Sequence, residues 1–473
     1  MALSTAGAAS VANPGLRLLL IASVGLVLLA LPAPATLGVA GSRTGIIFVV
    51  ALLLWVTEAL PMAVTALLVL VLQPLLGVAP ARTAFTTFMS PVFFFVLAMF
   101  AIALVIVSTG LDRRFALWLL ARAGTSPRRV VGAFMAGTAA LSSIMSDVPA
   151  CAIFMALAVG VLNRAGVPVG GSAFGKALMI GIPMAAYIGG VATPVGSSVN
   201  IVGMHFIEQF GGVRVPFVTW MLIGVPMAVV LVPLAATVLV AVYPPEIETV
   251  GHIDEVLAER RGLGGISAPE WKAVMVIGAM IGLWTASSWV PALDLTLIAV
   301  TGAIVMFLPG VRLLTWAEAE RGIGWSVLFL LGAVTSLGAA SEATGLATWI
   351  VDAALGGIAG WPIAAMVAAI GTLTVLVLLV LPIGPVVNAI LIPPISVLAL
   401  AHDTHPLTYT LPVAFTASCA LLLPLNPVGA ITYSRGYYQM HDMLGPGLLV
   451  SLAWVVWITV LMVTFLPVLA GGA

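Results

Sequence analysis

Long apolar runs fill most of this sequence and leave little room for a soluble fold. Hydrophobic residues make up 62% and charged residues only 7% of the 473 positions, whereas soluble domains carry about 25% charged residues. About 20 apolar residues are enough to cross the hydrocarbon core of a membrane as a helix. The sequence therefore predicts an all-α polytopic membrane protein with about 11 transmembrane helices.

The composition also narrows the function classes. The net charge is zero, so no basic surface for nucleic acid is indicated. No nucleophile–base pair and no metal-ligand spacing points to an enzyme, and we predict neither catalytic residues nor a cofactor. Cys151 and Cys419 lie in apolar segments and are expected to be small buried residues, not disulfide partners. The apolar run 16–31 lacks a cleavage site and is expected to be a retained first helix.

The two halves of the sequence resemble one another. VFFFVLAM (92–99) matches VLFLLGAV (327–334), and Gly110 and Gly345 keep the same offset. Chance similarity could explain any single pair, but a constant offset across several pairs favours a repeat, which is typical of secondary transporters. An odd number of spans per half, about five, makes the second repeat inverted in the membrane. The predicted segments are an N-terminal segment with the first helix (1–44), a first repeat (45–243), a cytoplasmic linker (244–269) and a second repeat (270–473).

The distribution of arginine along the chain predicts its orientation in the membrane. Cytoplasmic loops of membrane proteins are enriched in Lys and Arg, and one loop of this chain collects Arg113, Arg114, Arg122, Arg128 and Arg129. We therefore expect a multi-pass protein of the inner (plasma) membrane whose N-terminus, arginine-rich loop and linker are cytoplasmic.

One carboxylate interrupts a long uncharged stretch between Arg129 and Arg164. The 34 residues between these arginines would reach about 51 Å as one helix, whereas the hydrocarbon core measures about 30 Å, and they are too few for two spans and a turn. A re-entrant hairpin over about 130–163 fits, with Asp147 at its tip near the membrane midplane. Pro149 suits the first turn of the second arm, where its missing N–H costs no hydrogen bond.

The second half of the sequence predicts a corresponding re-entrant hairpin. A hairpin is predicted over about 362–400 with a break at 382–385, and broken helices are predicted over about 174–210 and about 409–440. Irregular backbone at membrane depth is tolerated only where protein or a water-filled cavity satisfies its polar groups. Freed carbonyls coordinate cations and half-helix N-termini attract anions, so two tips and two broken helices predict a site for an anion and a cation.

Four motifs in these regions resemble the divalent anion:sodium symporter (DASS, INDY-type) family, of which the chain is identified as a divergent member. They are WVTEALPMAVTALLVLVLQPLLG (55–77), GTSPRRVVGAFMAGTAALSSIMSD (124–147), ATPVGSSVN (192–200) and NPVGAITYSRGYYQMHDML (426–444). The resemblance implies a homodimer in which a transport domain moves like an elevator against a rigid scaffold. It also implies two hairpin tips that bind substrate carboxylates and shape two sodium sites.

Residue by residue, the resemblance implies a cation site formed by Ser142, Ser146, Asp147 and Gly196. It implies a substrate site drawn from both tips and both broken helices, namely Ser146, Asp147, Val148, Ser197, Ser198, Asn200, Gly384, Pro385, Asn426 and Pro427. No metal beyond sodium is implied.

The chain departs from the family pattern at both tips. Asp147 occupies the family's asparagine position, and Val148 occupies its threonine position. Ile383, Gly384 and Pro385 stand where the family has Ser-Asn-Thr, so no side-chain oxygen remains there. This departure puts the second sodium site and half of the carboxylate grip in doubt.

Two charged residues have competing interpretations. Asp147 fits a sodium ligand, a proton carrier that replaces the ion, or one member of a buried structural ion pair. Arg435 is the one basic residue between Arg321 and the C-terminal residue. It could compensate charge by replacing the lost sodium or by pairing with Asp147 or the substrate, or it could snorkel to the interface.

The sequence therefore predicts a secondary active transporter of small anions such as dicarboxylates, tricarboxylates or sulfate, coupled to sodium at the first tip. The alternative is a proton-coupled transporter or anion exchanger of the same fold that uses Asp147 and takes a smaller or monovalent anion. A channel or a non-transporting receptor on this fold is a further alternative.

Overall fold

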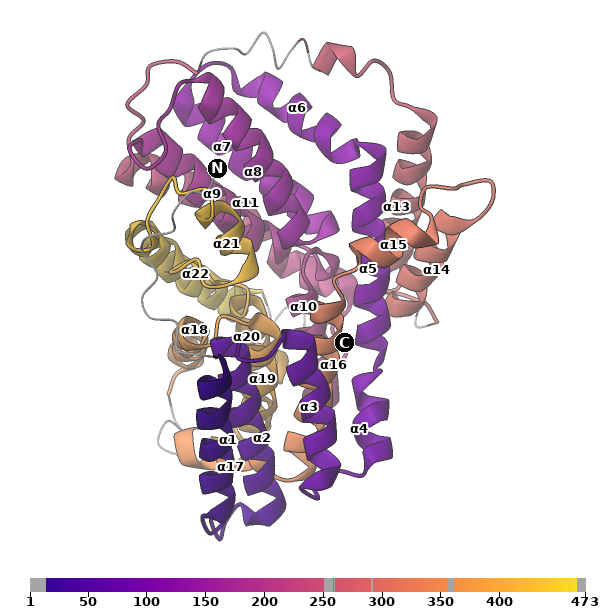
Figure 1. The fold of residues 1–473 in the computed structure, drawn as a ribbon, viewed down its shortest axis with the longest axis vertical. Coiled ribbons are helices and arrows are strands. Elements are labelled where there is room, and N and C mark those ends of the chain that lie inside the picture. Colours follow the sequence, from indigo (N-terminus) through magenta and orange to yellow (C-terminus); the bar gives the residue numbers. More distant parts are fainter. Residues whose placement is uncertain (1–13, 251–257, 259, 291, 356–360, 466–473) are drawn as a thin grey trace. The chain divides into compact units, whose positions relative to one another are not determined.

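The computed structural model describes residues 14–250, 258, 260–290, 292–355 and 361–465 (Figure 1). In these residues every regular element is a helix. Nine helical segments of the described chain are long and apolar enough to cross a membrane, and three shorter apolar helices accompany them. The all-α membrane architecture is therefore present, and the count of about 11 spans stays a prediction.

The helices of the first half are α1 (Pro14–Ala30), α2 (Gly38–Thr57), α3 (Met62–Leu75), α4 (Ala81–Phe88), α5 (Pro91–Thr109), α6 (Leu111–Ala123), α7 (Pro127–Met145), α8 (Asp147–Arg164), α9 (Ala173–Gly190), η1 (Pro194–Gly196), α10 (Ser198–Gly211) and α11 (Phe217–Val242). Those of the second half are α13 (Ala268–Ala286), α14 (Leu295–Phe307), α15 (Trp316–Gly322), α16 (Trp325–Ala343), α17 (Leu346–Leu355), α18 (Ile363–Val380), α19 (Gly384–Ala401), α20 (Leu407–Thr416), α21 (Pro427–Tyr433), η2 (Met440–Met443) and α22 (Leu444–Thr464).

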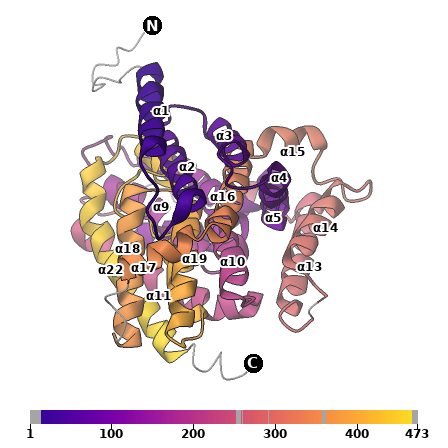
Figure 2. The same ribbon diagram turned by 90° about the horizontal axis from the view of Figure 1, so that it is seen from below.

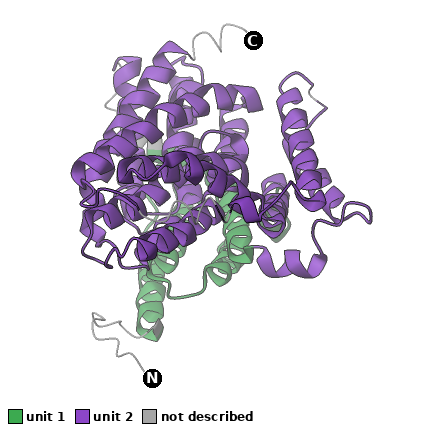
Figure 3. Ribbon diagram, turned by 90° about the horizontal axis from the view of Figure 1, so that it is seen from above, with its two compact units in different colours: residues 1–90, 324–354 green, residues 91–323, 355–473 purple. Residues whose placement is uncertain are grey.

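The chain divides into two compact units, coloured separately in Figure 3. Unit 1 comprises residues 1–90 and 324–354, and unit 2 comprises residues 91–323 and 355–473. This division follows the packing of helices and takes residues from both halves into each unit. The repeat boundaries predicted from the sequence concern the similarity between its two halves, not the packing of helices, and they stay a prediction.

In unit 1 the second-half helix α16 packs on the first-half helices α3 and α4. The Gln73 amide on α3 donates a hydrogen bond to the Ser336 hydroxyl on α16 at 3.0 Å. Phe88 packs on Phe329 with ring centroids 5.9 Å apart, and a Cβ atom at Gly332 would lie 2.7 Å from the Phe88 ring. Glycine at that position therefore allows the two helices to approach closely.

In unit 2 the first-half helix α5 packs on α13, α14 and α15 of the second half. The rings of Phe95 on α5 and Trp284 on α13 lie 6.3 Å apart. A Cβ atom at Gly322 would lie 2.3 Å from the side chain of Leu104. Figure 2 shows α13 and α14 side by side. Each half thus contributes one helix to a cluster of helices from the other half.

One junction of two helices at a glycine occurs in each half. Gly110 separates α5 from α6 with φ 80°, and Gly345 separates α16 from α17 with φ 74°. Glycine adopts this left-handed conformation without the steric cost that a Cβ brings. The two glycines that share an offset in the sequence therefore mark the same structural feature in each half. The inverted orientation of the halves stays a prediction.

Helix α9 forms the centre of unit 2, because it packs against α7, α8, α11 and α21. Nearly all of its residues are buried. A Cβ atom at Gly189 would lie 2.2 Å from the carbonyl oxygen of Ala139 on α7, so the backbones of α7 and α9 are in direct contact. This close packing holds the end of α9 beside the end of α7, where the candidate site lies.

Candidate functional site

The first tip, residues 146–149, lies where α7 ends and α8 begins. The two helices run side by side (Figure 1), and the rings of Phe134 and Phe154 pack edge to face between them with centroids 5.9 Å apart. Ser146 has φ 85° and ψ 155°. Such backbone costs a non-glycine residue about 1–3 kcal/mol and clusters at functional sites. The helix breaks where the sequence predicts a turn, and the re-entrant path stays a prediction.

The carboxylate of Asp147 accepts three hydrogen bonds from neighbouring groups. Its Oδ1 accepts from the Ser146 hydroxyl and from the backbone N–H of Val148, both at 3.0 Å. Its Oδ2 accepts from the Ser197 hydroxyl at 3.4 Å. The side chain is half-buried. Among the described residues, no Lys, Arg or His forms an ion pair with it.

The first break, residues 191–197, separates α9 from α10. A Cβ atom at Gly196 would lie 2.4 Å from the carbonyl oxygen of Gly190, so this position requires glycine. The Asn200 amide donates to the carbonyl oxygens of Gly190 at 2.7 Å and Thr193 at 2.9 Å. Its Oδ1 is buried without a hydrogen-bond partner in the described chain. A buried unpaired amide oxygen beside backbone carbonyls is a suitable ligand for a hard cation.

Hydrogen bonds join the end of α7 to α9 and the first break. The Ser142 hydroxyl donates to the carbonyl oxygen of Ala186 at 2.7 Å. The Thr193 hydroxyl donates to that of Ser143 at 2.5 Å. A Cβ atom at Gly196 would lie 3.1 Å from the Ser142 carbonyl oxygen. The four predicted cation residues therefore belong to one cluster at the ends of α7 and α9.

The second tip, residues 381–385, comprises the segment 381–383 between α18 and α19 and the first two residues of α19. A Cβ atom at Gly384 would lie 2.6 Å from the carbonyl oxygen of Ala417 and 2.9 Å from the side chain of Val199. The backbone N–H groups of Val386 and Val387 both donate to the Ile383 carbonyl oxygen. The second tip is thus packed directly on backbone and presents no side-chain oxygen.

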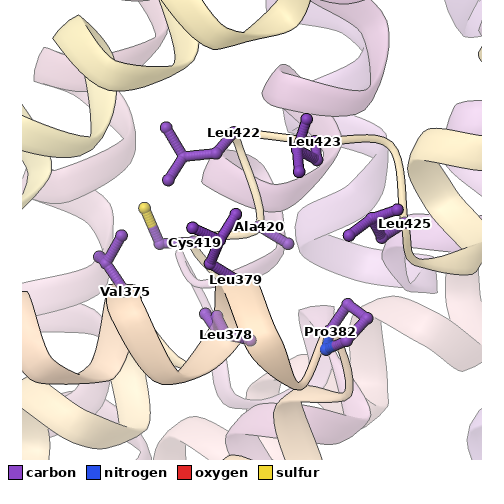
Figure 4. Close-up of a pocket in the computed structure, with 9 residues that line it drawn as sticks. All are labelled: Val375, Leu378, Leu379, Pro382, Cys419, Ala420, Leu422, Leu423 and Leu425. Atoms are coloured by element: carbon purple, nitrogen blue, oxygen red, sulfur yellow. The ribbon is translucent and has the colours of Figure 1, made fainter. Parts of the chain in front are cut away.

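The second break, residues 417–426, is apolar where it faces α18. Figure 4 shows a pocket there whose lining consists of Val375, Leu378, Leu379, Pro382, Cys419, Ala420, Leu422, Leu423 and Leu425. None of these side chains carries a charge or an oxygen. The wall of the second break that faces α18 is therefore apolar, whereas the buried hydroxyls of Thr416 and Ser418 beside it have no hydrogen-bond partner in the described chain.

Asn426 caps the short helix α21 and contacts α9. Its Oδ1 accepts from the backbone N–H of Gly429 at 3.1 Å. The Tyr187 hydroxyl donates to the same Oδ1 and accepts from the Gly429 N–H at 3.0 Å. The Cys151 thiol donates to the Val428 carbonyl oxygen at 3.4 Å. These bonds attach α21 to α8 and α9, beside the first tip.

The start of α10 links the two halves of the predicted substrate site. The Asn388 amide on α19 donates to the carbonyl oxygen of Val199 at 2.8 Å, and Val199 also contacts Gly384. Val199 stands between Ser198 and Asn200. Ser198 is half-buried and is the first residue of α10. Residues of the second tip therefore reach the same turn of α10 that approaches Asp147 through Ser197.

Three of the predicted site residues supply no hydrogen bond or ion pair to the candidate site in the described chain. Arg435 is exposed, and its Nε lies 3.2 Å from Met155 Sδ on α8; no ion pair joins it to Asp147 in the described chain. Pro385 and Pro427 each occupy the first turn of a helix, α19 and α21. They supply no N–H donor.

Three residues of this region were not predicted from the sequence: Tyr187, Asn388 and Cys151. Tyr187 stands four residues before the break of the α9–α10 segment, and Asn388 stands within the apolar arm NAILIPPI. A polar residue in an otherwise apolar arm was the available signal for Asn388. Nothing in the sequence indicates that Tyr187 or Cys151 faces α21, because that contact exists only through tertiary packing.

A second polar cluster ties α9 to the segment after α11. Glu246 accepts hydrogen bonds from the Ser172 hydroxyl and, at 2.8 Å, from the Phe174 N–H. Desolvation by the surrounding protein favours a raised pKa for Glu246 even though its side chain is exposed, but these donors outweigh it and hold the pKa below its ordinary value. Nearby, Lys176 pairs with Asp442 at 2.8 Å. This cluster fixes the N-terminal end of the helix that positions the first break.

Known proteins resemble this chain over most of its length. The sodium-dependent dicarboxylate transporter SdcS of Staphylococcus saprophyticus is 28% identical over 456 residues, which cover 89% of this chain and 87% of the relative. SdcS of Staphylococcus aureus strain USA300 is 25% identical, covering 88% and 84%. A transporter structure, YdaH of Alcanivorax borkumensis, superposes with a TM-score of 0.50 at 17% identity, covering 81% and 88%. That structure supports the fold alone.

The family described as "Sodium:sulfate symporter transmembrane region" matches residues 13–471, nearly the whole chain. The apolar helices and this match together describe a multi-pass membrane protein of a transporter family. The chain belongs to the sodium:sulfate symporter family, as a divergent member of the divalent anion:sodium symporters.

Proposed function

We propose that this chain is a secondary active transporter that carries small anions together with a coupling cation. The observation that carries the proposal is the meeting of the first tip and the first break, where the Ser197 hydroxyl reaches Asp147. Backbone carbonyls, hydroxyls and a carboxylate lie together there, and the Asn200 Oδ1 is buried without a partner in the described chain. Such an oxygen-rich cluster suits sodium, and sodium appears in the family description and in the relatives' names.

The substrate class follows from the relatives. The family description names sulfate, and the Staphylococcus relatives are named dicarboxylate transporters. We therefore propose di- or tricarboxylates or sulfate-like anions as substrates. In this proposal the first tip, the start of α10 and Asn426 surround the substrate, and the second tip contributes shape but no side-chain oxygen.

The proposed architecture concerns the repeats, the motion of the site, the oligomeric state and the orientation in the membrane. The two halves form inverted repeats, and each contributes a re-entrant hairpin and a broken helix to a site at the midplane. Unit 2 carries all the predicted site residues. The site moves across the membrane by an elevator motion within a homodimer. The protein lies in the inner (plasma) membrane with its N-terminus in the cytoplasm.

A second candidate is proton-coupled transport or anion exchange by the same fold. Two observations favour it: Asp147 stands where the family has a neutral asparagine, and the second tip has lost its side-chain oxygens. The carboxylate would then carry the proton itself, and a smaller or monovalent anion would be the substrate.

Uptake into proteoliposomes, with sodium and pH gradients imposed separately, distinguishes these candidates. Sodium-driven uptake of succinate or sulfate by the wild type is expected from the first proposal. Uptake that ignores sodium, follows the pH gradient and disappears in Asp147→Asn would replace it with the second. Asp294→Asn is a matched control, since Asp294 is exposed, caps α14 and is not one of the predicted site residues. Flux without any coupling would contradict both.

A further inference from the structure

An asparagine stands beside each break, and hydrogen bonds fix the two amides with opposite ends engaged. The Asn200 amide nitrogen donates to the carbonyl oxygens of Gly190 and Thr193, and its Oδ1 is left without a partner in the described chain. An amide has one acceptor end and one donor end. The asparagine of the first break therefore keeps an oxygen available, which suits the coupling cation of the proposed function.

At the second break it is the oxygen of the asparagine that is engaged. Asn426 Oδ1 accepts from the backbone N–H of Gly429 at 3.1 Å and from the Tyr187 hydroxyl. The Gly429 N–H also donates to the Tyr187 oxygen at 3.0 Å, so the single hydroxyl hydrogen of Tyr187 is directed at Asn426. A reversed amide would place the NH2 group of Asn426 against the Gly429 N–H, and two donors do not bond each other.

The two N–H donors of Asn426 Nδ2 are consequently left over. No hydrogen bond between described residues uses them, since the bonds of this side chain all involve Oδ1. The side chain is half-buried, so a ligand can reach it. Amide N–H groups are donors that suit an anion, and Asn426 belongs to the predicted substrate site. The two breaks therefore present opposite ends of the same side chain, an oxygen at the first and N–H groups at the second.

Tyr187 is held in the position that this orientation of Asn426 requires. Its side chain is 2% exposed and belongs to α9, whose end is in direct contact with α7 at Gly189. The preceding residue, Ala186, accepts a hydrogen bond from the hydroxyl of Ser142, one of the predicted cation residues. The same turn of α9 thus contacts the cation cluster through Ala186 and the substrate site through Tyr187.

We propose that Tyr187 is a positioning residue of the anion site, because its hydroxyl orients the Asn426 amide so that Nδ2 donates to the transported anion. The groups recognised are the oxygens of a carboxylate or of sulfate. This inference rests on the proposed function, since it concerns how the same site binds its substrate. Tyr187 acts through Asn426 and does not itself bind the anion.

Tyr187→Phe removes the hydroxyl and leaves the bond from the Gly429 N–H to Asn426 Oδ1, so the cap of α21 remains. Asn426 then loses one of the two groups that orient its amide. In proteoliposomes with a sodium gradient, we expect the KM for succinate or sulfate to rise about three- to tenfold and the maximal rate to stay within about twofold. Thermal stabilisation of the purified protein by sodium without an anion should be unchanged.

Tyr438→Phe is the matched control for a purely structural role. Tyr438 is also 2% exposed, and its hydroxyl contacts the same short helix, α21, at the Gly429 carbonyl oxygen (3.3 Å) and the Thr432 hydroxyl (3.0 Å). Among the described residues it forms no hydrogen bond with Asn426. We expect its KM to match that of the wild type. An equal rise of the KM in both variants would show that Tyr187 only stabilises α21 and would overturn the inference.

A double variant tests whether Tyr187 acts through Asn426. Asn426→Ser retains a capping oxygen and removes the NH2 group, and it is expected to raise the KM about tenfold or more. In the Asn426→Ser background, Tyr187→Phe should raise the KM by less than about twofold, because two residues that act as one unit are not additive. Effects that simply multiply would overturn the inference. Should Tyr187→Phe fail to fold, an unchanged KM in Asn426→Ser overturns it as well.

The outcomes separate this inference from the proposed function. Failure of the wild type to transport succinate or sulfate under either a sodium or a pH gradient contradicts the proposed function, and with it the anion site. Transport by the wild type with an unchanged KM in Tyr187→Phe overturns the role of Tyr187 and leaves the proposed function intact. The comparison of KM values is the same whichever cation drives uptake.

Discussion

The Ser197 hydroxyl at the start of α10 lies 3.4 Å from Oδ2 of Asp147 at the start of α8. The two residues are 50 positions apart, and each stands where a helix restarts after a break. Ser197 also accepts the backbone N–H of Val199 at 3.3 Å and so caps α10. One hydroxyl therefore connects the carboxylate of the first tip to the geometry of the first break.

Ser197→Ala is expected to remove both contacts of this hydroxyl, the cap of α10 and the hydrogen bond to Asp147. Loss of the cap and of the contact with Asp147 costs about 1–2 kcal/mol of stability. We expect the sodium concentration for half-maximal uptake to rise about five- to tenfold. Ser197→Thr keeps the hydroxyl and should retain most activity, and Ser434→Ala, at an exposed hydroxyl of unit 2, should change nothing. Equal uptake by Ser197→Ala and wild type would contradict the assignment.

Gly196→Ala is expected to disrupt the first break. The new Cβ atom would lie 2.4 Å from the Gly190 carbonyl oxygen, so the backbone must move at a cost of about 1–3 kcal/mol. We expect a lower thermal midpoint and loss of sodium-dependent uptake. Gly278→Ala is the matched control, because a Cβ atom there meets open space within the described structure and should be neutral or slightly stabilising. Similar midpoints for both variants would show that the break tolerates a side chain.

Arg114→Ala is expected to destabilise the protein by about 2–3 kcal/mol, somewhat less than a fully buried pair because Arg114 is partly exposed. Its Nε and Nη2 donate to Glu270 at 2.6 and 3.0 Å, and it also bonds backbone carbonyls that precede α13. Removal of the guanidinium leaves the Glu270 carboxylate buried without its cation. The double variant Arg114→Met/Glu270→Gln should recover part of the loss in a thermal melt. Arg122→Ala, which removes a stacking contact with Trp118, should cost less, and a double variant worse than Arg114→Ala would contradict this account.

The ionisation of Glu246 is expected to make the stability of the folded protein depend on pH. Its pKa is lower in the folded protein than in the unfolded chain, so the ionised form stabilises the fold. This contribution is complete above the unfolded pKa of about 4.3 and is lost as the pH falls toward the folded value. Glu246→Gln should therefore melt slightly below wild type at pH 7, by about 1 kcal/mol or less because the side chain is exposed, and the difference should vanish in acid. An unchanged difference at pH 4 and below would rule out ionisation as its origin.

The local breaks of the chain were predictable because backbone chemistry sets them. Proline and glycine weaken helices, and clusters of them with small polar residues lie beside the interruptions at Ser146, at 191–197 and at 381–383. Single prolines such as Pro183 and Pro226 stand inside unbroken helices, so the clusters and not the individual residues marked the breaks. The absence of side-chain oxygens at Ile383, Gly384 and Pro385 could likewise be seen in the sequence. The contacts of Tyr187, Asn388 and Cys151 were not, since each reaches an element far away in the sequence.

The amino-acid sequence was enough to predict a helical membrane protein, the places of its main helix breaks and a chemical difference between its two tips. Those properties depend on the solvent each segment requires and on residues a few positions apart. Only the tertiary structure shows that the hydroxyl of Ser197, 50 positions away, donates to Asp147, and that Arg435 lies against Met155 and does not pair with Asp147. Such contacts are set by the packing of α7, α8, α9 and α10 in three dimensions. Composition and spacing do not encode which polar group a carboxylate meets once those helices have packed.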